Sequence, residues 1–226
     1  MKVICFDLDD TLYKEIDYLK SAYKEIAKYA ARLCTDCSDR ANILSIKAYN
    51  RMLEAYYEEL NAFEELNRYL GLNIPIYDYL YIYRNHKPKI SLPVDIAHTF
   101  DILRIKSICI GLITDGRSLQ QRNKIEALEL NNWIDDEDII ISEEFGYEKP
   151  SQANYIYFMK RYPECHDFTY VGDNLSKDFI APNKLGWNTI CLKDNGKNIH
   201  KQVDERIEDE MTPKMWIDNI SDILYF

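Results

Sequence analysis

Short apolar runs that stop at polar residues recur along this chain. Runs of this kind predict buried strands, because a strand covered on both faces carries apolar residues at consecutive positions. The predicted strands are Val3–Phe6, Ile108–Ile113, Ile139–Ile141, Phe168–Val171 and Asn188–Leu192. Segments with helical spacing separate the later strands. This alternation predicts an α/β fold, with a Rossmann-like and mostly parallel sheet that has helices on both faces.

The interval between the first two strands has a different pattern. Apolar residues recur at intervals of three and four in two long segments, Ile16–Leu33 and Ile46–Leu60, and two shorter periodic segments follow. Short connections between such segments predict antiparallel helices. We therefore expect a helical-bundle cap domain over residues 14–91, inserted into a catalytic core formed by residues 1–13 and 92–226.

Two local expectations concern the later part of the chain. Pro150 is expected to be the first residue of a helix that runs to about Arg161, since proline suits that position. The segment Lys193–Pro213 is polar and predicts little regular structure.

The composition is that of an ordinary globular protein of 226 residues, with 46% hydrophobic and 29% charged residues. The formal net charge of −10 argues against nucleic acid or an anionic membrane as a partner, so an anionic substrate would need locally placed positive charge. No apolar run approaches the roughly 18 residues that span a bilayer, and the chain enters a strand rather than a signal peptide. We expect a cytoplasmic protein, either a monomer or a homodimer.

The six cysteines are scattered along the chain. Cys5 and Cys109 lie in apolar runs, where free thiols are usually buried, so disulfides are not expected. Cys34 and Cys37 have the spacing of half a zinc site, but no second pair follows and the nearest histidine is far along the chain. The sequence does not predict zinc, and the role of this pair stays open.

Polar side chains follow the predicted strands at their carboxyl ends, where ligands bind in open α/β sheets. Asp7 and Asp9 follow the first strand, and alternation along an extended chain puts them on the same side. Two carboxylates about 4 Å apart repel by roughly 4 kcal/mol at an effective dielectric near 20, so the pair predicts a cation. Carboxylate ligands beside a substrate phosphate favour Mg²⁺.

The later strand ends supply complementary groups. Thr114 offers a hydroxyl to a phosphate oxygen, and Lys149 supplies positive charge. Asp173 adds a metal ligand, and Asp178 could orient metal-bound water or Lys149. Each residue also has an ordinary explanation, as an N-cap, a solvated loop residue or a turn residue. Their occurrence at successive strand ends favours a common site.

Together these segments resemble the signatures of the haloacid dehalogenase-like hydrolase superfamily, in the phosphatase branch whose helical cap follows the first signature. The matching segments are Asp7–Thr11, Thr114, Lys149–Pro150 and Gly172–Asp178. The resemblance implies that Asp7 is the nucleophile, forming an aspartyl-phosphate, and that it also binds Mg²⁺.

The resemblance implies roles for the other residues as well. Asp9 would protonate the leaving alkoxide and then activate water, with its backbone carbonyl on the metal. Thr114 and Lys149 would hold the phosphoryl group, Asp173 would bind Mg²⁺, and Asp178 would support the water around the metal. An acidic residue at Asp9 points to phosphate chemistry, because the dehalogenases and phosphonate-cleaving members lack an acid there.

The leading hypothesis is a magnesium-dependent phosphatase that hydrolyses a phosphomonoester of a small metabolite. The alternatives are a phosphosugar mutase that uses the same aspartate pair and a catalytically idle binding protein. The motifs do not separate the first two. Possible substrate-binding residues are Asp115 and Arg117, just past Thr114, and Arg84, near the return from cap to core. A phosphosugar, a phosphoglycolate-like acid or a nucleotide would each fit.

Overall fold

The computed structural model describes residues 1–202 and 209–226. The chain divides into two compact units, one formed by residues 1–16 and 91–226 and the other by residues 17–90. Each unit has buried apolar residues of its own.

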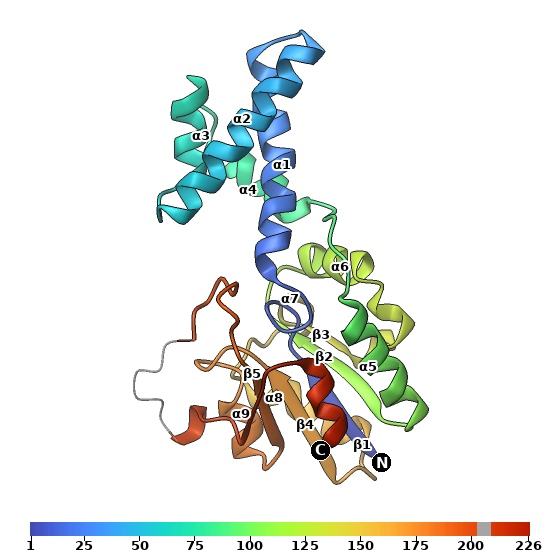
Figure 1. Ribbon diagram of the computed structural model, residues 1–226. Coiled ribbons are helices and arrows are strands. Elements are labelled where there is room, and N and C mark those ends of the chain that lie inside the picture. The colour runs from blue at the N-terminus through green and yellow to red at the C-terminus, as the bar shows by residue number, and fades with distance from the viewer. Residues whose placement is uncertain (203–208) are drawn as a thin grey trace. The chain divides into compact units, whose positions relative to one another are not determined.

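Within the described residues, six strands form one sheet in the first unit, and every neighbouring pair is parallel. The strands are β1 (Lys2–Phe6), β2 (Cys109–Thr114), β3 (Ile139–Ile141), β4 (Asp167–Gly172), β5 (Asn188–Leu192) and β6 (Met215–Ile217). Their order across the sheet is β3-β2-β1-β4-β5-β6 (Figure 1). The predicted parallel α/β sheet is confirmed.

The helices of this unit connect successive strands. They are α5 (Val94–Ile105), α6 (Ser118–Ala127), α7 (Ser142–Phe145), α8 (Gln152–Arg161) and α9 (Ile180–Lys184), with short 3₁₀ turns at Leu130–Asn132, Asp136–Asp138, Asp209–Met211 and Ile220–Tyr225. None of the helices in residues 1–202 and 209–226 is both long enough and apolar enough to cross a membrane.

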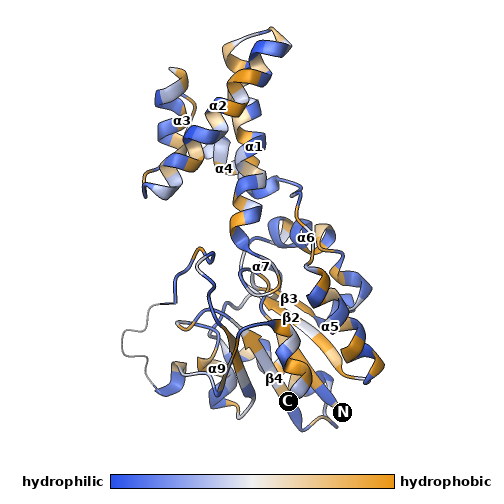
Figure 2. Ribbon diagram, in the orientation of Figure 1, coloured by the Kyte–Doolittle hydropathy of each residue, from blue (hydrophilic) through white to orange (hydrophobic). Residues whose placement is uncertain are grey.

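Alternating residues of β1 contact helices on opposite faces of the sheet. Val3 and Cys5 belong to a buried cluster with Tyr155 and Phe158 of α8. Phe6 points the other way and packs against Phe100 of α5, with 5.1 Å between ring centroids. Figure 2 shows that apolar residues dominate the strands. Burial on both faces explains why β1 has a continuous apolar sequence rather than an alternating one.

The pairing of β1 positions the residues that follow it. Phe6 lies opposite Leu112 of β2 and Val171 of β4, and the Asp7 amide donates to the Val171 carbonyl at 2.8 Å. Asp7 therefore emerges at the sheet edge where β2 and β4 also end.

The second unit consists of helices. Helix α1 (Glu15–Cys34) begins in the first unit and continues through the second, followed by α2 (Ser38–Tyr57), α3 (Ala62–Leu70) and α4 (Ile76–Asn85). The Asn61 side chain accepts from the first amides of α3, and Gly71 ends that helix in the left-handed conformation, with φ 66°. Phe63 packs against Tyr23 and Tyr79. These elements form from the periodic segments noted in the sequence.

The structure differs from the sequence-based expectations at Pro150 and at β6. Pro150 is not the first residue of a helix: Ser151 is the N-cap of α8, its hydroxyl accepts from the Ala153 amide, and the helix begins at Gln152. In the polar segment 193–213, residues 203–208 lie outside the described part of the chain, and residues 209–211 form a 3₁₀ turn. The short strand β6 was not predicted. Strand β3 is equally short but fully buried and apolar, whereas Trp216 at the centre of β6 is exposed.

Candidate active site

A polar cavity of about 140 Å³ lies at the carboxyl ends of the strands, within the first unit. Most of its lining is acidic, and much of it comes from residues that end or follow β1, β2 and β4. The lining residues are Asp7, Asp9, Asp10, Glu15, Thr114, Asp115, Asp173, Asn174, Lys177 and His200. The cavity thus brings together residues from three of the four strand ends that the sequence singled out, those of β1, β2 and β4.

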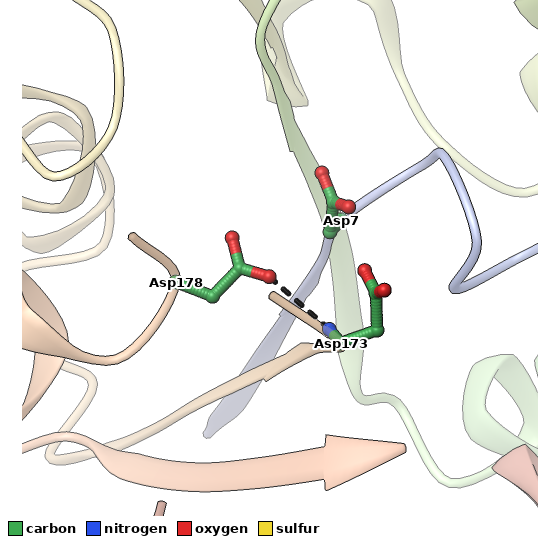
Figure 3. A group of neighbouring side chains, drawn as sticks. All are labelled: Asp7, Asp173 and Asp178. Carbon is green, nitrogen blue, oxygen red and sulfur yellow. Dashed lines mark hydrogen bonds between the residues drawn. The ribbon is translucent and has the colours of Figure 1, made fainter. Parts of the chain in front are cut away.

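Three buried aspartates form the centre of the site. Asp7, Asp173 and Asp178 each place a carboxylate oxygen within 4.8 Å of the others. Figure 3 shows the three side chains gathered at the ends of β1 and β4. Burial, together with the neighbouring carboxylates, raises the pKa of Asp173 to about 9. Burial likewise raises the pKa of Asp7 to about 7, although Lys149 opposes the shift.

This donor set fits a metal ion. The ligands are all carboxylate oxygens, which hard divalent cations prefer. The cluster carries three formal negative charges, and Lys149 is the one cation that hydrogen bonds to it among the described residues. A divalent cation would neutralise this excess of negative charge. The Asp9 carboxylate is not part of this group.

Lys149 links two of the three aspartates. Its Nζ lies 2.6 Å from Asp7 Oδ1 and 2.8 Å from Asp178 Oδ1, and it also contacts the Tyr170 hydroxyl at 3.1 Å. The Lys149 side chain is fully buried. Burial disfavours its charge, but Asp178 and Asp7 outweigh that effect and raise the pKa of Lys149 well above its ordinary value. The ammonium is therefore held beside the predicted nucleophile.

Asp178 orders the turn that carries Asp173. While its Oδ1 accepts from Lys149, its Oδ2 accepts from the backbone amides of Asp173 and Asn174 at 3.1 and 2.8 Å. The turn also needs glycine at position 172, because a Cβ there would collide with Asp178 Oδ2. Asp178 thus holds Lys149 in place, which is one of the two roles expected for it. It also lies near enough to Asp7 and Asp173 to bind the same metal ion.

Asp9 lies in a different environment from Asp7. Its carboxylate oxygens accept from Lys124 Nζ at 2.7 and 2.8 Å, from Gln121 Nε2 at 2.9 Å and from the Tyr13 hydroxyl at 2.5 Å. Burial favours the neutral acid, but Lys124 and Gln121 outweigh it and hold the pKa of Asp9 below its ordinary value. Asp9 is therefore a carboxylate held by donors on α6.

Sequence reasoning missed Lys124 and Gln121. Both are almost fully buried on α6, a helix whose first residue follows β2 within a few positions. Gln121 Nε2 also contacts the Thr114 hydroxyl at 2.7 Å, which fixes that side chain at the cavity. A signal was present, since two long polar residues three positions apart lie on a helix that must pack against a sheet. It was too common a pattern to interpret alone.

The predicted substrate residues differ in their surroundings. Asp115 accepts from the Lys149 amide at 3.0 Å and from Lys177 Nζ at 3.1 Å, so it supports the site. Arg117 is exposed and paired with Glu143 at 2.6 Å. Arg84 belongs to α4 in the helical unit.

Three further cavity residues were not identified from the sequence. Lys177 contributes a positive charge next to Asp115, and His200 lines the same cavity. Glu15, the first residue of α1, is half-buried beside Asp9, and loss of solvent together with the Asp9 charge raises the pKa of Glu15 to about 8. Cys34 and Cys37, the possible half zinc site, are both exposed free thiols in the helical unit.

Comparison with known proteins extends this picture. A family model described as haloacid dehalogenase-like hydrolase matches residues 4–192. A protein from Methanocaldococcus jannaschii named glyceraldehyde 3-phosphate phosphatase is 31% identical over 200 residues, which cover 85% of each chain. A protein of the same name from Methanopyrus kandleri is 27% identical over 237 residues, covering 99% of this chain and 96% of its own.

Solved structures share the fold at lower identity. A putative HAD-hydrolase, YfnB from Bacillus subtilis, solved with magnesium, superposes with a TM-score of 0.64 at 18% identity, covering 99% of this chain and 96% of its own. A putative beta-phosphoglucomutase from Thermotoga maritima gives a TM-score of 0.65 at 14% identity, covering 100% of this chain and 97% of its own. These likenesses concern the fold.

Proposed function

Because the chain belongs to the haloacid dehalogenase-like hydrolases, we propose that it is a magnesium-dependent phosphatase that cleaves a phosphomonoester of a small metabolite. One observation carries the proposal. Three buried aspartates gather beside Lys149 at one edge of the sheet, and two of them, Asp7 and Asp173, line a small polar cavity. The relatives' names as phosphatases support the reaction class.

Asp7 is the proposed nucleophile. One of its oxygens would attack phosphorus, the bond from phosphorus to the ester oxygen would break, and an aspartyl-phosphate would form. Lys149, 2.6 Å from Asp7, would compensate charge on the phosphoryl oxygens, and the Thr114 hydroxyl would donate to one of them. Bound between Asp7, Asp173 and Asp178, Mg²⁺ would neutralise the carboxylates and reduce their repulsion for the phosphate.

Asp9 is the proposed proton carrier. In its protonated form it would give a proton to the leaving alkoxide, and the carboxylate so formed would take one from the water that hydrolyses the aspartyl-phosphate, which restores the acid. The Lys124 ammonium favours the ionised carboxylate, which is the form that accepts a proton from water. Lys124 and Gln121 thereby hold Asp9 in position for the second half of the reaction.

The cavity favours a small substrate. Its volume of about 140 Å³ is below the roughly 300–1,000 Å³ typical of pockets for drug-sized ligands. The relatives are named for a three-carbon phosphate ester. We propose a short-chain phosphate ester of that size, with glyceraldehyde 3-phosphate the first to test.

A substrate panel tests the function. Glyceraldehyde 3-phosphate, phosphoglycolate, glucose 6-phosphate, glucose 1-phosphate and a nucleoside monophosphate are assayed for released phosphate, each with Mg²⁺ and with a chelator. We expect Mg²⁺-dependent release that is fastest with the three-carbon ester and is absent in Asp7→Asn. As a matched control, Asp36→Asn changes an exposed aspartate in the helical unit and should keep the activity.

Two outcomes would contradict the proposal. Phosphate release that continues undiminished in the chelator would rule out the metal requirement. If ³¹P NMR shows that glucose 1-phosphate is converted to glucose 6-phosphate without release of free phosphate, the mutase is favoured instead.

A further inference from the structure

Both carboxylate oxygens of Asp173 are held by neutral donors. The Thr11 hydroxyl lies 3.3 Å from Oδ1, and the Asn198 amide nitrogen donates to Oδ2 at 2.8 Å. Neutral donors orient a carboxylate without cancelling its charge, and each carboxylate oxygen has a second lone pair. The other two aspartates of the cluster both accept from Lys149. Asp173 is therefore the member whose charge is left for a bound cation.

The Asn198 amide is itself fixed in one orientation. Lys14 Nζ donates to Asn198 Oδ1 at 2.6 Å, and it also contacts the Asp10 carbonyl at 3.2 Å. With a cation at its oxygen, the amide must present its NH₂ group on the other side, where Asp173 lies. Asn198 is buried, so water competes little for these bonds.

The segment 194–202 that carries Asn198 is tied to the same site. Asp194 Oδ1 accepts from three successive backbone amides, the last of them that of Asn198. The Ile199 amide donates to Asp10 Oδ2 at 2.8 Å, and Gln202 Nε2 donates to the Asp173 carbonyl at 2.8 Å. The segment has no helix or strand, but its side-chain bonds set its position beside the end of β4.

We propose that Asn198 is a positioning residue of the metal site, which holds Asp173 so that its remaining lone pairs face the cation. The proposal rests on the proposed function, since it presumes that Mg²⁺ binds between Asp7, Asp173 and Asp178. Hydrogen-bonding partners of metal ligands typically contribute 10- to 100-fold to metal affinity. A role limited to holding the segment in place would change folding stability but not the affinity for the ion.

The test measures Mg²⁺ binding without substrate, by titration calorimetry of the full chain. Asn198→Ala is expected to raise the Kd for Mg²⁺ at least about tenfold. Asn195→Ala is the matched control, because Asn195 belongs to the same segment and is exposed; its Kd should stay within twofold of wild type. Equal Kd values for Asn198→Ala and wild type would overturn the inference.

Lys14→Met provides a second variant that leaves Asn198 in place. It frees the amide to rotate, so a smaller rise in the Kd is expected. Because Lys14 acts through Asn198, the double variant should bind no more weakly than Asn198→Ala alone. Strictly additive effects would contradict the proposed coupling. If Asn198→Ala does not fold, a Kd for Lys14→Met equal to wild type would by itself overturn the inference.

The wild-type titration separates the two proposals. If the wild-type protein binds no Mg²⁺, the proposed metal-dependent function fails, and this inference fails with it. If wild type binds Mg²⁺ and both variants bind it equally well, only the role of Asn198 is refuted.

Discussion

The crowded carboxylates predict that the metal-free protein is destabilised by rising pH, and that Asp173→Asn removes much of this effect. The pKa of Asp173 is raised from an ordinary value of 3.8 to about 9, first by burial and then by Asp7 and Asp178. Between these two values the folded protein holds a proton that the unfolded chain has released. The stabilisation that Asp173 contributes to the folded state is therefore greatest below pH 3.8 and is lost as the pH rises toward about 9.

The magnitude follows from the linkage relation. One proton taken up on folding changes the free energy of unfolding by about 1.4 kcal/mol per pH unit. Asparagine at position 173 cannot ionise, so the variant lacks this slope. The free energy of unfolding of Asp173→Asn minus that of wild type should therefore rise by about 2.7 kcal/mol from pH 6 to pH 8. Both proteins are measured in the presence of a chelator.

The assay is urea unfolding at pH 6, 7 and 8, followed by circular dichroism. Saturating Mg²⁺ should stabilise wild type most at pH 8 and should stabilise Asp173→Asn far less, because a ligand that binds only the folded state adds its binding free energy. Asp36→Asn is the control and should parallel wild type at each pH. A constant difference between Asp173→Asn and wild type across the three pH values would refute the reasoning.

Three further substitutions have defined outcomes. Asp7→Asn should lower the rate of phosphate release by at least about a thousandfold while the circular dichroism spectrum stays native, since an amide is a poor nucleophile; turnover near wild type would contradict the assigned nucleophile. Lys124→Met should lower the free energy of unfolding, measured in urea, by about 3 kcal/mol. This is the low end for breaking a buried ion pair, because the Asp9 side chain is 19% exposed. A cost below about 0.5 kcal/mol would show that the pair is unimportant. Gly172→Ala should lower the free energy of unfolding by about 1–3 kcal/mol and should lower kcat, because the added Cβ would lie 2.8 Å from Asp178 Cγ and displace that side chain. An unchanged unfolding midpoint would mean that the turn adjusts freely.

The sequence predicted the parts of the fold that have strong local signals. Strands β1, β2 and β4 are covered on both faces, and that burial demands the continuous apolar runs by which they were identified. Helices α1 and α2 overlap the predicted periodic segments Ile16–Leu33 and Ile46–Leu60, although α2 ends at Tyr57. Pro150 was misassigned because proline is favoured both at the start of a helix and in the turn before one, and Ser151 takes the capping role.

The missed site residues share one property. Lys124 contacts Asp9, and Asn198 contacts Asp173, each across a long stretch of chain. No local sequence pattern identifies such a residue, because lysine and asparagine are just as common at solvent-exposed positions of helices and loops. Strand ends can be aligned from topology alone, whereas the side chains that approach them from helices and loops depend on packing in three dimensions.

The strand order has a consequence for how this protein is made. Strand β1 leaves the ribosome well before both of its partners, since Val3 pairs with Cys109 and Phe168. Until β4 has been synthesised, β1 has an open edge that other chains can extend. The intervening helices rely on nearer contacts and can assemble during that wait. Chains that stop before β4 should therefore aggregate, even though they already contain the nucleophile.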